Sequence, residues 1–183
     1  RYWVAEHHNL ANFAGTSPEI MVGQIASRTN TIRVGSGGVM LPHYSALKVA
    51  ENFRMLETLF PGRIDLGIGR APGSDQITAA ALAYPRVPID INHYPQQVKD
   101  VMSFLGDTHA NEHMFNSVFA GPGQFTIPDI WLLGSRIDSA ALAAEMGLPY
   151  SYAHFFGTSV ELGPKIVEMY RKNFKPSVYL DRP

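Results

Sequence analysis

Apolar and polar positions follow two different spacings along the chain, and these spacings predict which segments form strands and which form helices. The apolar residues of 46–60 recur every three to four positions, which predicts an amphipathic helix. Residues 63–69 (RIDLGIG) alternate instead, which predicts a strand. The other predicted strands are 2–5, 31–41, 129–133 and 149–154, and the other predicted helices are 18–28, 76–83, 96–105, 139–146 and one from a capping box at 158–161 to about 173. Strands that alternate with helices indicate an α/β fold with a parallel sheet.

The length of 183 residues limits the architecture. A complete (β/α)8 barrel needs about 250 residues, so about five or six strand–helix units fit here. The chain starts at Arg1 and enters an apolar strand at once, which predicts a fragment. Between about 71 and 127 the periodicity weakens and five prolines interrupt it, which predicts a long loop or insertion. We therefore expect a single incomplete domain over 1–183.

Composition and charge argue against several classes of protein. With Lys+Arg 15 against Asp+Glu 16, the net charge is -1, so we expect no nucleic-acid partner. The absence of cysteine excludes disulfides, thiolate nucleophiles and Cys-containing zinc sites. No stretch approaches the roughly 20 apolar residues that span a bilayer, and the first residues do not resemble a signal peptide. These features predict a cytoplasmic protein without a membrane partner.

Residues suited to binding and proton transfer follow the predicted strands: Glu6-His7-His8, Gly35 to Gly38, Gly69-Arg70, Gly134-Ser135-Arg136, and His154. Because the carboxyl ends of parallel strands meet at one edge of a sheet, we expect these clusters to converge on one cavity. An imidazole beside a carboxylate suits proton transfer near neutral pH. Only one of His7 and His8 should face a given cavity, since successive side chains of an extended segment point to opposite sides. A hydrogen-bonded structural pair is the alternative interpretation.

Arg70, Ser135 and Arg136 have the chemistry of an anion site. A helix N-terminus offers unpaired N–H groups, a hydroxyl adds a donor, and a guanidinium matches a phosphate. Ordinary helix caps and surface arginines are the alternative for these residues.

A second string of residues suggests a different class of enzyme. Residues 109–113 (HANEH) match the HxxEH pattern of zinc peptidases, with His109, Glu112 and His113 as the candidate residues. The surrounding sequence is polar and lacks a clear helical period, so coincidence is the more frequent reason for such a match. A zinc hydrolase stays as a second hypothesis.

Three longer strings resemble the bacterial luciferase-like monooxygenase family, and together they cover roughly half the chain in the order found in that family. They are residues 3–9 (WVAEHHN), 27–75 (SRTNTIRVGSGGVMLPHYSALKVAENFRMLETLFPGRIDLGIGRAPGSD) and 128–156 (PDIWLLGSRIDSAALAAEMGLPYSYAHFF). The VGSGGVMLP and GRIDLGIGRAPG strings resemble the single-chain subgroup. Members are flavin-dependent (β/α)8 barrels. The resemblance therefore implies a partial (β/α)8 TIM barrel with about strands two to six present and the first strand and the last two missing.

The resemblance also implies roles for residues at the flavin ring. His7 matches the family histidine that serves catalysis at the flavin. The bond between Gly37 and Gly38 matches a non-proline cis peptide beneath the isoalloxazine ring, and Gly69 matches the residue beside the ring.

Further matches lie at the flavin phosphate. Arg70 matches the phosphate-binding arginine, and Gly134 with Ser135 matches the phosphate-binding turn. Relatives commonly carry serine where Arg136 stands, so Arg136 either binds the phosphate or faces the solvent. The resemblance implies no specific role for His154.

As a member of this family, the protein is expected to be a flavin-dependent monooxygenase that uses reduced FMN and O2 to oxygenate a small organic substrate. Its expected partners are that substrate, O2 and a separate flavin reductase, and a homodimer is compatible with the family. A deazaflavin-dependent oxidoreductase of the same fold and an inactive flavin-binding relative are the alternatives.

Overall fold

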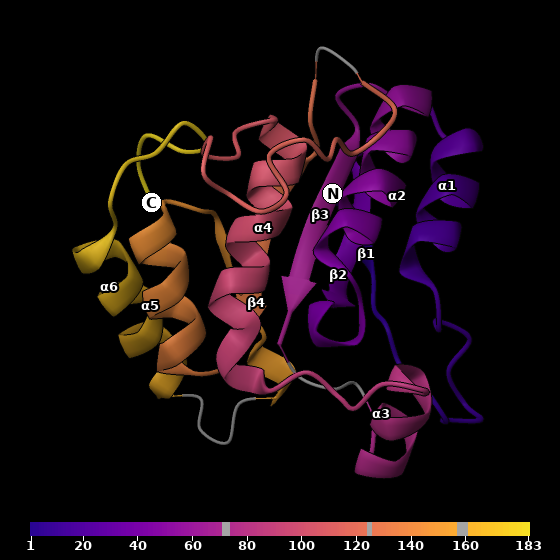
Figure 1. Ribbon diagram of the computed structural model, residues 1–183. Helices are drawn as coiled ribbons and strands as arrows, with labels where there is room; N and C mark the ends of the chain where they lie inside the picture. The colour runs from indigo at the N-terminus through magenta and orange to yellow at the C-terminus, as the bar shows by residue number, and fades with distance from the viewer. Residues whose placement is uncertain (71–73, 124–125, 157–160) are drawn as a thin grey trace.

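The computed structural model describes residues 1–70, 74–123, 126–156 and 161–183 (Figure 1). The predicted capping box at 158–161 and the GRAPGSD string at 69–75 lie partly outside these residues. The strands are β1 (Tyr2–Val4), β2 (Val34–Met40), β3 (Ile64–Gly69), β4 (Asp129–Gly134) and β5 (Tyr150–Tyr152). The helices are α1 (Pro18–Ser27), α2 (Ala46–Leu59), α3 (Gln76–Ala83), α4 (Tyr94–Gly106), α5 (Ile137–Met146) and α6 (Leu162–Asn173), with 3-10 turns η1 (Leu41–His43), η2 (Ile91–His93) and η3 (His154–Phe156).

The five described strands form one parallel sheet in the order β1-β2-β3-β4-β5. Strand order follows chain order because each helical connection returns the chain to the next position along the sheet. Helices α1, α2, α4, α5 and α6 form a curved outer layer along the sheet (Figure 1). This arrangement is a half-barrel and confirms the predicted α/β fold and partial (β/α)8 barrel.

The two faces of the sheet carry different residues, and this difference accounts for the side that the helices cover. Bulky apolar side chains at alternate positions pack beneath the helices and are fully buried or nearly so: Val34, Ile64, Leu66, Ile68, Ile130 and Leu132. The positions between them point to the concave side and are mostly small or polar: Gly35, Gly37, Asp65, Gly67 and Gly69. The hydrophobic core therefore lies between the sheet and the outer helices.

The segment predicted as a long loop over about 71–127 contains three helical elements among its described residues: α3, η2 and α4. Helix α4 begins at Tyr94, and its buried side chains, Val98, Val101 and Leu105 among them, place it in the core against α2. Pro95 occupies the first turn of this helix, where its missing N–H costs no hydrogen bond. Residues 94–106 are therefore part of the barrel framework rather than of an insertion.

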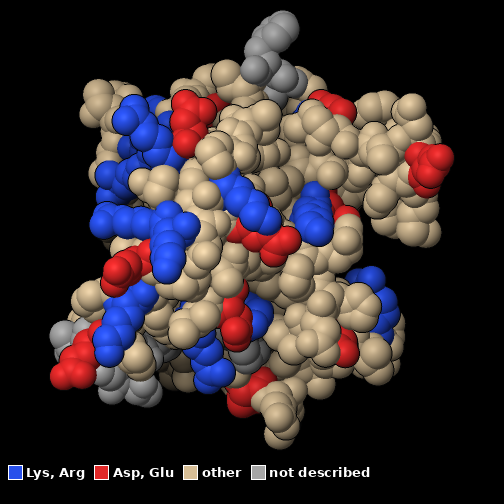
Figure 2. Space-filling model, turned by 90° about the vertical axis from the view of Figure 1, so that its left-hand side faces the viewer, with Lys and Arg blue, Asp and Glu red and all other residues tan. Residues whose placement is uncertain are grey.

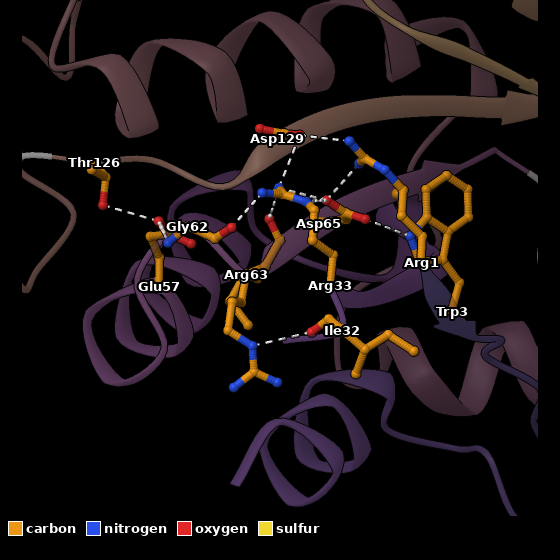
Figure 3. Close-up of polar contacts among 12 residues, drawn as sticks. Arg1, Trp3, Ile32, Arg33, Glu57, Gly62, Arg63, Asp65, Thr126 and Asp129 are labelled. Atoms are coloured by element: carbon orange, nitrogen blue, oxygen red, sulfur yellow. Dashed lines mark hydrogen bonds and ion pairs between the residues drawn. The ribbon is translucent and has the colours of Figure 1, made fainter. Parts of the chain in front are cut away.

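Charged side chains lie next to one another at the amino ends of the strands (Figure 3). The carboxylate of Asp65 is fully buried, and its Oδ1 atom accepts hydrogen bonds from Arg1 Nη1 at 2.7 Å and from Arg33 Nε at 2.8 Å. Its Oδ2 atom accepts from Trp3 Nε1 at 2.8 Å. Arg33 Nη2 also lies 2.8 Å from Asp129 Oδ2. One buried carboxylate and the two arginines bonded to it thus connect four neighbouring strands.

The outer face that carries α5 and α6 has basic and acidic side chains next to one another (Figure 2). Within the described ranges, no helix is both long enough and apolar enough to cross a membrane.

The buried carboxylate at the amino ends generates a prediction about stability. Replacing Arg33 with alanine removes a cation from Asp65 and should lower the free energy of unfolding by about 3 kcal/mol. Urea unfolding of the chain would measure this loss.

The matched control is Lys48→Ala, which removes an exposed ion pair between Lys48 and Glu51 with 3.4 Å between charged atoms. Exposed pairs of this kind contribute about 0.5 kcal/mol or less. Equal losses for Arg33→Ala and Lys48→Ala would contradict a stabilising role for the buried network.

Candidate active site

The carboxyl ends of four neighbouring strands carry the residues that the sequence singles out. His7 follows β1, the Gly37–Gly38 bond lies within β2, and Arg70 follows β3. Gly134 ends β4, and Ser135 and Arg136 lead into α5. Because these strands are parallel and adjacent, the residues lie along one edge of the sheet. His154 lies in η3 after β5, where it is exposed.

The side chain of Glu6 connects three parts of this edge. It is fully buried, and its Oε2 atom accepts a hydrogen bond of 2.9 Å from the backbone N–H of Met40 at the end of β2. Its Oε1 atom accepts one of 2.8 Å from Tyr44 Oη and lies 2.7 Å from Nε2 of His8. Sequence reasoning placed Glu6 beside the histidines but missed Tyr44 and Met40, because both are more than 30 residues away in sequence.

His7 and His8 have different surroundings, as their adjacent positions predict. The His8 ring contacts Glu6, whereas the His7 ring packs on Phe13 with 4.7 Å between ring centroids. The backbone N–H of His7 donates to Gly15 O at 2.8 Å. This bond joins the beginning of the loop after β1 to the end of the same loop, shortly before α1. The assignment of His7 as the catalytic residue stays a prediction.

The backbones of β2 and β3 approach closely where the Gly37–Gly38 bond lies, and this bond is cis, as the resemblance implies. A Cβ atom on Gly67 would lie 2.1 Å from the backbone oxygen of Ser36. The pairing of the two strands also shifts register between Gly37 and Val39. Any side chain larger than hydrogen at Gly67 would push these strands apart.

A pocket of about 370 Å³ lies between the end of β3 and the amino ends of α4 and α5, with Arg70, Tyr94, Asp138 and Ser139 among its lining residues. Arg70 Nη2 lies 3.7 Å from Asp138 Oδ2, and both side chains are partly or largely exposed. The guanidinium therefore has a weak and solvent-screened partner. A larger cavity of about 650 Å³ lies at the amino ends of β4 and β5, away from the sequence-predicted residues.

In the turn after β4, the backbone of Gly134 lies next to the hydroxyl of Ser139. A Cβ atom on Gly134 would lie 2.0 Å from Ser139 Oγ, so only glycine fits there. Ser139 Oγ donates to Arg136 O at 2.9 Å, and Tyr150 Oη donates to Gly134 O at 2.6 Å. The side chain of Arg136 is exposed, and Ser135 is half-buried. Both residues precede the positive end of the α5 dipole.

Burial affects the tyrosines of the site. Burial and the Glu6 carboxylate raise the pKa of Tyr44 above its usual range, so its hydroxyl stays protonated and donates to Glu6. Burial likewise raises the pKa of Tyr150, whose hydroxyl donates to the turn after β4.

The zinc-hydrolase hypothesis finds no ligand set in the described part of the chain, where no three His, Asp or Glu side chains group as metal ligands. The rings of His109 and His113 stack with 4.8 Å between centroids, and the His109 ring also contacts Phe104. Nδ1 of His113 accepts a hydrogen bond from the N–H of Phe115. These contacts are typical of side-chain packing.

A half-barrel with its candidate residues at the carboxyl ends of the strands is the architecture of a (β/α)8-barrel enzyme. The family model for luciferase-like monooxygenases matches residues 1–177, and the chain belongs to this family. It is 44% identical over 183 residues to a luciferase-like monooxygenase of Escherichia coli (strain K12), with 100% of this chain and 52% of that protein covered. It is 52% identical over 183 residues to the uncharacterized protein YwcH of Bacillus subtilis (strain 168), covering 100% of this chain and 54% of that protein.

Among solved structures, that of apo-MsnO8 is similar, with a TM-score of 0.89, 39% identity, and coverage of 100% of this chain and 52% of that chain. The chain thus spans about half the length of the relatives it matches.

Two structures with 17% identity share the fold. One is the oxygenating constituent of 3,6-diketocamphane monooxygenase from Pseudomonas putida in complex with FMN (TM-score 0.68, 96% of this chain, 54% of that chain). The other is an F420-dependent secondary alcohol dehydrogenase in complex with an F420-acetone adduct (TM-score 0.65, 97% of this chain, 57% of that chain).

The close approach of β2 and β3 predicts the outcome of a single added methyl group. We expect Gly67→Ala to lower the free energy of unfolding by about 1–3 kcal/mol, because the new Cβ meets backbone rather than a flexible side chain. The control is Gly123→Ala, where nothing lies within 4 Å of an added Cβ. Denaturant unfolding of both variants checks this prediction, and a Gly67→Ala variant as stable as Gly123→Ala would contradict it.

Proposed function

We propose that a full-length version of this protein, meaning this chain extended to the length of its relatives, is a flavin-dependent monooxygenase. It binds reduced FMN at the carboxyl ends of β1–β4 and uses O2 to oxygenate a small organic substrate. The observation that carries the proposal is the arrangement of His7, the glycines of β2 and Arg70 along one edge of the sheet. Membership in the luciferase-like monooxygenase family supports the reaction class.

The residues present fit a flavin phosphate in charge and in shape. Arg70 has only a weak ion pair with Asp138, so its guanidinium can turn to a phosphate dianion. The first turn of α5 lines the same pocket as Arg70, and Ser135 precedes this helix, so its hydroxyl and the free N–H groups of the helix would add donors. In this proposal Arg70, Gly134 and Ser135 hold the phosphate, and the exposed Arg136 approaches it from the solvent side.

The flavin ring is assigned to the glycine-lined part of the edge. Gly37, Gly38 and Gly69 carry no side chains of their own, so the ring would lie against backbone beside Trp3 and Met40, which pack next to Gly37 and Gly69. The loop after β1 places His7 at the neighbouring strand. Bound reduced flavin supplies the electrons that activate O2. The chain's own part is to position the ring, limit access of water and hold a proton at the His7 imidazole.

FMN is the proposed flavin, and a separate flavin reductase is the proposed source of its reduced form. An FMN complex and an F420 adduct both occur among solved proteins of this fold, so the fold is compatible with either of these cofactors. The family match and the similarity to the E. coli monooxygenase favour FMN with O2.

The catalytic assignment predicts the effect of His7→Ala. In the full-length version, this variant should lower the rate at which O2 reoxidises bound reduced FMN by about 100-fold, since a positioned proton donor or base contributes that much. Stopped-flow absorbance of the flavin measures the rate. His113→Ala, outside the proposed site, is the control and should behave as the unmodified protein. If reduced FMN bound to the His7→Ala variant is reoxidised as fast as in the unmodified protein, His7 is not catalytic.

The phosphate assignment predicts a difference between two flavins. Arg70→Ala should weaken binding of FMN by about 10-fold or more while changing the dissociation constant of riboflavin by less than about twofold, because riboflavin lacks the phosphate. Flavin fluorescence titration of the full-length version measures both constants.

Two further variants test the same contact. Asp138→Asn removes the carboxylate that competes for Arg70 and should tighten FMN binding, whereas Arg28→Ala removes an exposed arginine at the far end of α1 and should change nothing. Equal weakening of FMN and riboflavin by Arg70→Ala would show that Arg70 does not bind the phosphate.

A further inference from the structure

Glu6 is a fully buried carboxylate that the proposed chemistry does not use directly. Each of its hydrogen-bonding partners belongs to a different part of the site edge: Met40 ends β2, Tyr44 precedes α2, and His8 follows His7. A buried carboxylate costs several kcal/mol unless its oxygens are hydrogen-bonded, and Glu6 has three donors for two oxygens. The geometry of the loop after β1 therefore depends on this side chain.

Glu57 provides a comparison within the same chain. It is also fully buried, but it lies at the amino end of the sheet, where its Oε1 accepts from Gly62 N at 2.7 Å and from Thr126 Oγ1 at 2.9 Å (Figure 3). Its second oxygen, Oε2, has no partner among the described residues. Glu57 connects framework segments only, whereas every partner of Glu6 belongs to the edge that carries the candidate residues.

We propose that Glu6 is a positioning residue of the flavin site, which holds the loop that carries His7 against the end of β2 that carries the Gly37–Gly38 bond. This inference rests on the proposed function. Met40 is the second residue after Gly38, so its hydrogen bond to Glu6 fixes the distance between this loop and the strand end. Glu6 and His8 contact each other, so His7 between them projects to the other side.

The bond between Glu6 and His8 also fixes where a proton resides. The carboxylate accepts at Oε1, so His8 carries a proton on Nε2. In Glu6→Gln, the single amide oxygen can still accept from the backbone N–H of Met40. The amide NH2 group then takes the place of Oε1 and faces His8. The neutral His8 ring should change to the tautomer with its proton on Nδ1, because Nε2 must now accept.

The experiment compares Glu6→Gln with Glu57→Gln in the full-length version. Long-range 1H–15N spectra of the flavin-free protein, assigned with single His→Gln variants, report the tautomer of His8 and the environment of His7. Fluorescence titration with FMN gives the dissociation constant. We expect Glu6→Gln to switch the His8 tautomer, move the His7 signals and weaken FMN binding at least about tenfold, while Glu57→Gln does none of these.

Each outcome decides between the hypotheses. If the unmodified protein binds FMN and Glu6→Gln binds it equally well, the positioning role is overturned. If the unmodified protein does not bind FMN, the proposed function itself fails, and no variant is needed to see this. Should Glu6→Gln not fold, Tyr44→Phe removes a single donor and keeps the ring, and unchanged FMN binding by that variant overturns the proposal.

Discussion

Close contact between the backbones of β2 and β3 is the constraint on which the sheet and the site both depend. Ser36 Oγ bonds to the backbone oxygen and to the N–H of Gly67, at 2.8 and 3.0 Å, so a buried hydroxyl supplements the strand pairing. The contact is possible because glycine occupies the concave positions. At the same positions the neighbouring side chains of Trp3 and Met40 lie against Gly37 and Gly69. One constraint therefore affects both the packing of the sheet and the proposed flavin site.

The two ends of the sheet bear different kinds of polar network. At the amino ends, Asp65 is bonded by arginines and a tryptophan, which satisfies a buried charge and stabilises the strand order. At the carboxyl ends, Glu6 is bonded by a backbone amide, a hydroxyl and an imidazole, and none of these is a permanent cation. Asp65 therefore pairs with the cations of the framework, whereas Glu6 holds together donors from three segments of the candidate site.

The alternating and helical spacings allowed most of the elements to be predicted, because each depends on neighbours in sequence. Helix α3 at 76–83 agrees with its prediction residue for residue. The start of α4 was missed because Pro95 resembles a break, although it lies in the first turn of the helix. Residues 31–33 were predicted to extend a strand, but the Arg33 side chain there bonds to Gly62 and Ile64 oxygens before β2 begins.

The positions of the candidate residues along the sheet were predictable, but their contacts were not. Parallel strands place their carboxyl ends together, so the order of elements alone was enough to predict that His7, Gly38, Arg70 and Ser135 share an edge. The partners of Glu6 could not be predicted, because they depend on how the loop after β1 folds over the end of β2. Long-range polar contacts of this kind have no signature in local spacing.

The weak pairing of Arg70 follows from the same geometry and bears on how an anion would bind. Asp138 lies in the first turn of α5, where the helix dipole favours its negative charge, and this placement keeps it near Arg70 without a close contact. A phosphate beside Ser135 would use the same dipole and the same guanidinium, so it would compete with Asp138 for both. The phosphate carries more charge and more acceptor oxygens, so the exchange favours it. Because the contact between Asp138 and Arg70 is long and exposed to solvent, little is lost when a phosphate displaces the carboxylate from the guanidinium.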